Sequence, residues 1–193
     1  MERSFSLKIH DPGHVLPADQ DGAPLLKTVQ AGQPCFAETL GWHCVEQWAG
    51  TERLAEYRAL ADEVCRDADA MAVVGIGGSN QGARAVIDAL GRRPDHPEII
   101  WAGNTISPHS MADVLEKLKE KKSVYVNVIA KNFETLEPGI GFRVLRQYLQ
   151  QTYGPGWEKR VIATGTRGSR LEELCTRHGF RFLSVHRLCA RKN

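Results

Sequence analysis

A cluster of glycines followed by one hydroxyl lies in the segment VVGIGGSNQGARA, at residues 73–85. Gly77 and Gly78 have no side chain, so their backbone N–H groups can approach a ligand closely. Ser79 follows them where a helix-like repeat begins, and the N-terminus of a helix carries a partial positive charge. Residue types in this order are suited to binding an anion.

The spacing of the glycines separates three kinds of anion. A dinucleotide-binding loop has the pattern GxGxxG, but Asn80 stands where the third glycine belongs, which disfavours a nicotinamide-dependent oxidoreductase. A triphosphate-binding loop needs GK and then Ser or Thr, but Ala83 and Arg84 follow Gly82. We therefore expect a pocket for one phosphate group. The alternative is a tight strand-to-helix turn that binds nothing.

Two further polar segments follow predicted strands. Asn104 and Thr105 come after the second apolar run, and Lys131, Asn132 and Thr135 come after the third. The carboxyl ends of parallel strands lie at one edge of a sheet, where open α/β folds bind ligands. A lysine supplies charge there, and a helix N-terminus supplies oriented N–H groups. The predicted phosphate-binding residues are Gly78, Ser79, Lys131 and Thr135, with Gly77, Asn104, Thr105 and Asn132 as further pocket residues.

The elements that position these residues form a regular alternation from about residue 70 onward. Short apolar runs alternate with segments of helical period, which is typical of βαβ units and a parallel sheet. Right-handed crossovers place helices on both faces, so we predict a three-layer α/β/α sandwich with a mainly parallel sheet, similar to flavodoxin. The five predicted strands are 72–75, 99–102, 123–129, 160–164 and 180–185. Four helices are predicted between these strands. The first has an apolar stripe at 83–90 and ends before Gly91, and the second begins at Ser107-Pro108. The third spans about 137–153, and the fourth lies between a capping box formed by Ser169 and Glu172 and the terminating Gly179.

The chain before this alternation has a different character. Residues 1–45 are rich in Gly, Pro, Asp and His with little periodicity, and we interpret them as an N-terminal arm. A helix is predicted from about Val45 to Arg66, with Thr51 as a candidate N-cap. The predicted domain therefore spans residues 46–185.

Composition excludes several classes of protein. The 193 residues carry a net charge of +2, which gives no sign of a nucleic-acid partner. Five cysteines without a CxxC pair indicate neither a disulfide framework nor a zinc site. No segment has the apolar length of a signal peptide or a membrane helix. We expect a cytoplasmic protein without a metal or nucleotide cofactor.

Three segments of the chain resemble consecutive motifs of the glucose-6-phosphate isomerase family, within its first sugar-isomerase (SIS) domain. They are VVGIGGSNQGARAVIDAL, GNTISP and SVYVNVIAKNFETLEPGIGFRVLRQYL. The likeness covers roughly residues 40–182. It implies that the serine of GIGGS and the loop after the third strand bind the phosphate of a sugar phosphate, through Gly78, Ser79, Lys131 and Thr135.

The phosphate loop departs from the family pattern. That loop usually has the sequence SKSGTT or SKTFTT, so Ala130, Asn132 and Glu134 each replace a hydroxyl residue. Glu134 also brings a carboxylate near the bound dianion. We expect its side chain to cap the following helix instead.

Family members continue through a VGGR motif into a second SIS domain, which supplies their glutamate base, ring-opening histidine and lysine. Here HRLCARKN, residues 186–193, stands where that continuation is expected, so we expect a divergent tail, no second SIS domain and no catalytic residue in this chain. The resemblance implies an isomerase of glycolysis and gluconeogenesis that interconverts glucose 6-phosphate and fructose 6-phosphate through an enediolate, as a homodimer and without a cofactor. The alternative is a non-catalytic phosphosugar-binding SIS module.

Overall fold

Five short, mostly apolar runs form one sheet in the computed structural model, which describes residues 27, 49–91 and 93–185. The strand order is β2-β1-β3-β4-β5, and every neighbouring pair is parallel. The strands are β1 (Ala70–Val74), β2 (Glu98–Ala102), β3 (Val124–Ile129), β4 (Val161–Thr166) and β5 (Arg181–Val185). The predicted tail at 186–193, and the predicted arm at 1–45 apart from Lys27, lie outside the described residues.

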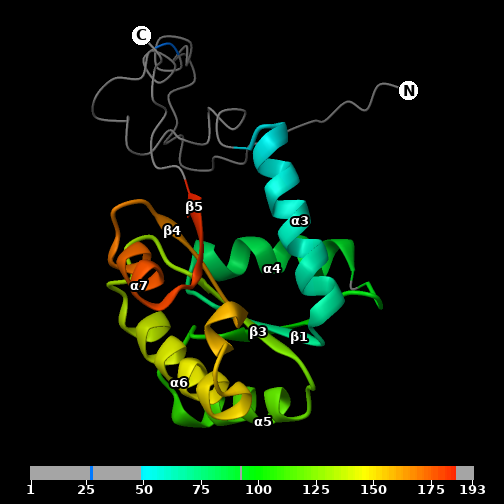
Figure 1. Ribbon diagram of the computed structural model, residues 1–193, viewed down its shortest axis with the longest axis vertical. Helices are drawn as coiled ribbons and strands as arrows, with labels where there is room; N and C mark the ends of the chain where they lie inside the picture. The colour runs from blue at the N-terminus through cyan, green and yellow to red at the C-terminus, as the bar shows by residue number, and fades with distance from the viewer. Residues whose placement is uncertain (1–26, 28–48, 92, 186–193) are drawn as a thin grey trace, which may run out of the picture.

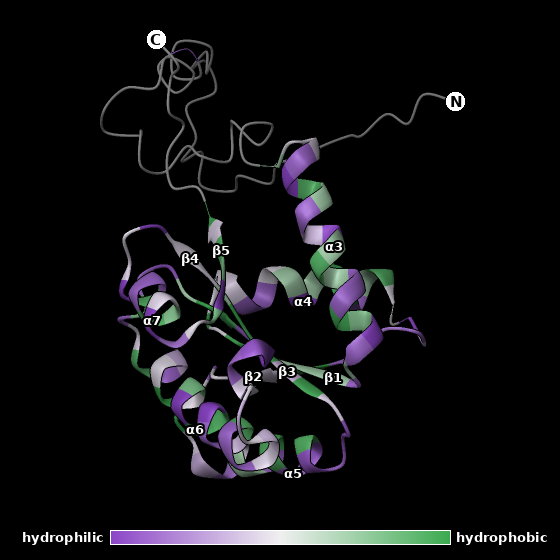
Figure 2. Ribbon diagram, viewed as in Figure 1, coloured by the Kyte–Doolittle hydropathy of each residue, from purple (hydrophilic) through white to green (hydrophobic). Residues whose placement is uncertain are grey.

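Helices cover both faces of the sheet (Figure 1), which confirms the predicted three-layer α/β/α fold. They are α3 (Thr51–Asp67), α4 (Gly78–Leu90), α5 (Pro108–Lys119), α6 (Leu136–Tyr153) and α7 (Arg170–His178), with a short 3-10 helix, η2 (Trp157–Arg160). Figure 2 shows hydrophilic and hydrophobic residues alternating along α6, as expected of a helix with one buried face.

The main core lies between the sheet and the layer formed by α5, α6 and α7. Val114 and Leu118 of α5, Phe142 of α6, and Leu171 and Cys175 of α7 are all buried against the same strands. On the other face α3 makes a smaller core, in which Val64 packs against Tyr125 and Ile162. The sheet is therefore held much more tightly on one face than on the other.

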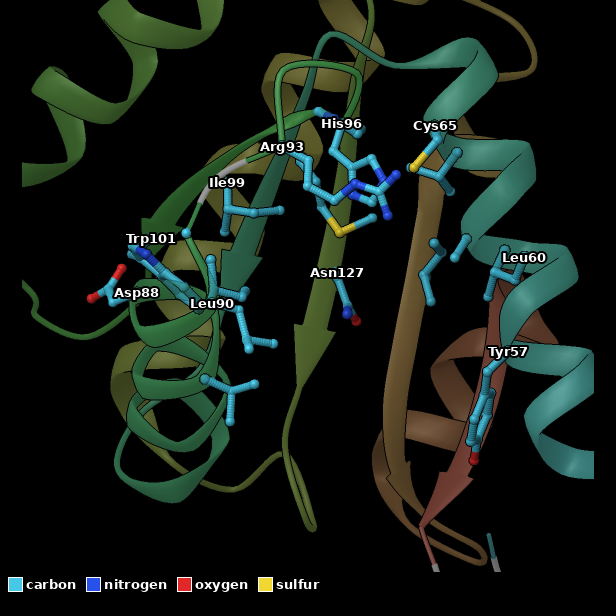
Figure 3. A pocket seen from close by; sticks show the side chains of 18 of the residues that line it. Tyr57, Leu60, Cys65, Asp88, Leu90, Arg93, His96, Ile99, Trp101 and Asn127 are labelled. Atoms are coloured by element: carbon cyan, nitrogen blue, oxygen red, sulfur yellow. The ribbon is translucent and has the colours of Figure 1, made fainter. Parts of the chain in front are cut away.

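Helix α4 covers its face less well than its sequence predicts. Its apolar stripe includes Val86 and Leu90, but these side chains are 57% and 82% exposed. Asn80 is the only residue of α4 that is buried. The stripe lines an open groove over the sheet because α3 and α4 stand apart (Figure 3).

The predicted starts of α5 and α7 and the predicted end of α7 are confirmed, and each lies at a capping side chain or a terminating glycine. The Ser107 hydroxyl accepts a hydrogen bond from the Ser110 N–H (3.4 Å), with proline next in the chain. Ser169 caps α7 in the same way, although the Glu172 carboxylate accepts from Gly168 N–H (2.6 Å) rather than from Ser169 as a full capping box would. Gly179 ends α7 in the left-handed conformation.

The predicted start of the first described helix is wrong. Gly50 is the N-cap of α3, its backbone is extended, and its carbonyl accepts the N–H of Leu54 (3.0 Å). Thr51 is already helical and makes no capping hydrogen bond. Ala49 and Gly50 are not helical, and residues 45–48 lie outside the described residues. Glycine serves as an N-cap almost as well as threonine, so the hydroxyl of Thr51 was not sufficient to identify the N-cap of α3.

A polar cluster ties α3 to the amino edge of the sheet. The guanidinium of Arg160 lies over the rings of Tyr125 (5.3 Å) and Tyr153 (4.1 Å). The Tyr125 hydroxyl donates to the Asp67 carboxylate (2.7 Å). Burial, with the hydrogen bond to the Asp67 carboxylate, raises the pKa of Tyr125 to about 12.

Within the described part of the chain, no helix combines the length and apolar character needed to cross a membrane.

Candidate functional site

The loop after β1 presents free backbone donors at the start of α4. Gly77 is the N-cap, with φ 55°, a backbone conformation that favours glycine. No side chain caps this helix. Among the described residues, the N–H groups of Gly77 and Gly78 have no protein acceptor, whereas Ser79 N–H donates to Ile76 O (3.1 Å). Two unpaired donors at a helix N-terminus are suited to an anion.

The buried side chain of Asn80 bonds to the backbone of this loop, a role that the sequence did not predict. Its side chain is 1% exposed, and its Nδ2 donates to the carbonyl of Gly75 (3.3 Å). Its Oδ1 is buried without a partner among the described residues. The sequence signal was its position, since Asn80 replaces the third glycine of a nucleotide-binding loop.

The loop after β1 lies against the end of β3. A Cβ placed on Gly75 would be 3.1 Å from the carbonyl oxygen of Ile129 and 3.1 Å from the Cβ of Ser79. Both atoms therefore lie close to Gly75. Ser79 is thus near the carboxyl end of β3, the strand that leads into the loop with Lys131. A side chain at residue 75 would require one of these neighbours to shift by a few tenths of an ångström.

The loop after β3 is tied to β4 at its beginning. The N–H of Ala130 donates to Thr164 O (3.0 Å), and the N–H of Thr166 donates to Lys131 O (3.2 Å). Lys131 is exposed and Asn132 is half-buried. The Thr166 hydroxyl beside this loop is buried with no partner among the described residues, and the sequence analysis did not single it out.

Thr135 and Glu134 lie at the start of α6, and neither side chain caps the helix. Thr135, which is exposed, is the N-cap of α6, yet its hydroxyl makes no capping hydrogen bond. The expectation that Glu134 caps this helix is wrong, because Glu134 lies one residue before the cap and its exposed carboxylate bonds to no helix N–H in the described structure. The Glu134 charge is therefore free to act on an anion at this loop.

The loop after β2 packs closely onto its neighbours. Gly103 has φ 68°, and a Cβ there would be 2.5 Å from Val74 Cγ1. A Cβ on Gly141 of α6 would be 2.9 Å from the Cα of Gly103. The Thr105 hydroxyl accepts the N–H of Ser107 (3.1 Å), so it serves the turn, while Asn104 is exposed.

Two cavities near these loops have different linings. Thr135 contributes to a cavity of about 400 Å³ between α6 and α7, which also includes Arg143, Arg170 and Arg177. Neither Ser79 nor Lys131 lines it. The structure thus joins Ser79 to the end of β3 but turns Thr135 toward a separate hollow.

A larger cavity, of about 790 Å³, is the groove between α3 and α4 (Figure 3). Its lining is mostly apolar, with Leu60, Leu90 and Trp101 around Asn127 of β3. It contains none of the predicted phosphate-binding residues. Cys65 also lines it, and burial together with Asp62 raises the pKa of that thiol, which makes it a poor nucleophile.

No group of three or more His, Cys, Asp or Glu residues within the described ranges could hold a metal ion. The other described cysteine, Cys175, is buried, and burial raises its pKa to about 11. The loops at the carboxyl edge present backbone donors, hydroxyls, amides, the Lys131 ammonium and the Glu134 carboxylate.

Comparison with known proteins connects this edge to a family. The family model described as phosphoglucose isomerase matches residues 59–183. A glucose-6-phosphate isomerase from Acetivibrio thermocellus is 38% identical over 152 residues, which cover 73% of this chain and 34% of that protein. One from Shouchella clausii is 40% identical over 135 residues, covering 65% of this chain and 30% of that protein. The chain spans about a third of the length of these curated relatives.

Two solved structures are similar as well. A hypothetical protein from Thermus thermophilus matches with a TM-score of 0.72 at 21% identity, covering 85% of this chain and 39% of that one, and supports the fold alone. A glucose-6-phosphate isomerase from Chlamydia trachomatis matches with a TM-score of 0.55 at 28% identity, covering 70% of this chain and 24% of that one.

Proposed function

Because the chain belongs to the phosphoglucose isomerase family, we propose that residues 46–185 form a sugar-isomerase domain that binds the phosphate group of glucose 6-phosphate and fructose 6-phosphate. The observation that carries this proposal is the meeting of the first and third strand ends. Ser79 and the carbonyl of Ile129 both lie close to Gly75, and Ser79 directly follows the unpaired N–H groups of Gly77 and Gly78. Three donors on one side of a phosphate, with a lysine after the neighbouring strand, form a suitable pocket.

Each residue has a separate task in this proposal. Gly77 and Gly78 donate backbone N–H groups, and Ser79 donates its hydroxyl to a phosphate oxygen. Lys131 supplies a positive charge that attracts the dianion. Thr135 lines the cavity between α6 and α7, so its hydroxyl must turn away from that cavity to donate to the phosphate. We therefore expect Thr135 to contribute less to phosphate binding than Ser79. Asn132, Asn104 and Thr105 line the rim where the sugar hydroxyls would lie.

In the complete protein, we propose that this anchor serves an aldose–ketose isomerase. The reaction moves a proton between C2 and C1 of the open sugar through an enediolate. Binding energy at the phosphate, far from the reacting carbons, positions C2 against a base. By resemblance, the glutamate base, the histidine and the lysine belong to a second SIS domain, so the 193 residues alone should turn over substrate negligibly. We also propose a cytoplasmic homodimer for the complete protein.

The second candidate function is a non-catalytic phosphosugar-binding module. It is favoured by one observation, that the candidate site presents donors suited to a phosphate group, the N–H groups of Gly77 and Gly78 at the start of α4. A coupled assay with glucose 6-phosphate distinguishes the two functions only for longer versions of the chain. Both functions require the same phosphate pocket.

Calorimetric titration of the 193-residue chain with fructose 6-phosphate tests the pocket. Ser79→Ala should weaken binding about tenfold or more, because a hydrogen bond to a charged group contributes about 1.5–3 kcal/mol. The control is Thr152→Ala, which removes an exposed hydroxyl near the other end of α6. Equal affinities of the wild type and Ser79→Ala would remove Ser79 from the pocket.

A further inference from the structure

Phe133 has an unusual backbone conformation within the proposed phosphate loop. Its φ is 62°, and it is the one residue other than glycine with a positive φ in the described part of the chain. An aromatic side chain disfavours this left-handed region, so the conformation persists only where the surroundings impose it. Something must therefore hold Phe133 in place.

The ring of Phe133 is held by the main core. It meets the ring of Phe142 edge-to-face, with centroids 6.0 Å apart at 74°. Phe142 is 2% exposed and in turn meets Phe180 at 5.9 Å, while Trp157 lies 5.4 Å from Phe180. A row of aromatic contacts thus connects the loop to side chains that cannot move without opening the core.

Among the described residues, no hydrogen bond holds the middle of this loop. The carbonyl of Lys131 accepts from Thr166, and the carbonyl of Thr135 accepts from Gly139. Between these ends, Asn132, Phe133 and Glu134 make no hydrogen bond with any part of the chain that the structure describes. The ring of Phe133 is therefore the anchor of the loop between its two ends.

We infer that Phe133 is a positioning residue, whose partly buried ring holds the loop from Lys131 to Thr135 in the conformation that presents Lys131 and Asn132 to a phosphate group. This inference rests on the proposed phosphate site. The ring itself does not touch the ligand. Its effect is to keep the binding-competent loop conformation populated before the ligand arrives, which preserves affinity.

Two substitutions distinguish the effect of the Phe133 ring on binding from the effect of the strained backbone at this residue. Phe133→Ala removes the ring and leaves a side chain that disfavours positive φ. Phe133→Gly also removes the ring, but glycine adopts positive φ without strain. Positioning by the ring predicts that both variants lose affinity, whereas a role limited to backbone strain predicts that Phe133→Gly binds as well as the wild type.

The experiment uses the 193-residue chain and two measurements, calorimetric titration with fructose 6-phosphate and amide hydrogen exchange of Thr166 and Gly139, whose N–H groups donate to the carbonyls of Lys131 and Thr135 at the two ends of the loop. Phe133→Ala and Phe133→Gly should each bind about tenfold more weakly, the loss expected if the competent loop conformation falls to a tenth of the population. Exchange of these two amides should be faster in both variants. Phe133→Tyr keeps the ring and should restore both properties.

The matched control is Leu174→Ala. Leu174 packs against the same core and lines the same α6–α7 cavity as Phe133, but it lies outside the loop. Its truncation should lower stability while leaving affinity and the exchange of the Thr166 and Gly139 amides unchanged. Wild-type affinity in Phe133→Gly, or unchanged exchange in Phe133→Ala, would overturn the inference. If the wild type itself binds no sugar phosphate, the proposed function fails, and the exchange comparison still decides whether the ring holds the loop.

Discussion

Replacing Gly141 with alanine should destabilise the chain, although the same change in a helix usually stabilises it. Inside a helix, alanine is favoured over glycine by about 1 kcal/mol. At Gly141 the new Cβ would lie 2.9 Å from the Cα of Gly103 and 3.4 Å from Met111 Cε. Gly103 has little room to shift, because Val74 also lies close to it: a Cβ built on Gly103 would be 2.5 Å from Val74 Cγ1. The added methyl group therefore forces the β2 loop or α6 to move.

Gly139 gives a control in the same helix. A Cβ on Gly139 would meet nothing within 4 Å. Gly139→Ala therefore gains only the helix preference and should stabilise the chain by about 1 kcal/mol. Because this gain is common to both variants, the difference between them measures the steric overlap at Gly141. Overpacking of this kind costs about 1–3 kcal/mol.

The measurement is urea unfolding of the 193-residue wild type and both variants, followed by far-ultraviolet circular dichroism. The unfolding free energy of Gly141→Ala should lie about 1–3 kcal/mol below that of Gly139→Ala. Equal unfolding free energies for the two variants would show that α6 and the β2 loop are not in contact as described. The packing of the carboxyl edge would then need revision.

Two further predictions concern charge. The pKa of Tyr125 is about 12 in the folded chain against a usual value of 10.0, so its contribution to stability is complete below pH 10 and is lost as the pH rises toward 12. Tyr125→Phe should flatten this alkaline loss in urea midpoints measured from pH 9 to 12, and an unchanged slope would contradict the assignment. Glu134→Gln should raise affinity for fructose 6-phosphate about threefold at low salt, since it removes a like charge, and the gain should shrink in 1 M salt. A calorimetric salt series showing no gain at low salt would place the Glu134 carboxylate away from the phosphate.

Much of the fold could be predicted because its signals are local. Each strand is a short apolar run, and the helix boundaries at Ser107, Ser169 and Gly179 depend on hydrogen bonds or backbone angles within a few residues. The exposure of the apolar stripe on α4 could not be predicted in this way. Spacing identifies Val86 and Leu90 as an apolar face, but whether that face is covered depends on where α3 packs.

The candidate site shows the same division. The position of Ser79 and Lys131 follows from the rule that parallel strands end at one edge, so the sequence was sufficient to find the edge. The burial of Asn80 and the left-handed conformation of Phe133 depend on contacts with distant segments. The error at Glu134 arose because the sequence did not show which residue of this loop is the helix cap.

The position of β1 between β2 and β3 matters during synthesis on the ribosome. Its two neighbours are β2 and β3, and β3 begins at Val124, fifty residues after β1 ends at Val74. At about 5–20 residues per second, translation of that interval takes about 3–10 s. Throughout this time one side of β1 has no strand to bond, and an open apolar strand edge attracts other chains. The nascent polypeptide is therefore most in need of a chaperone before β3 emerges.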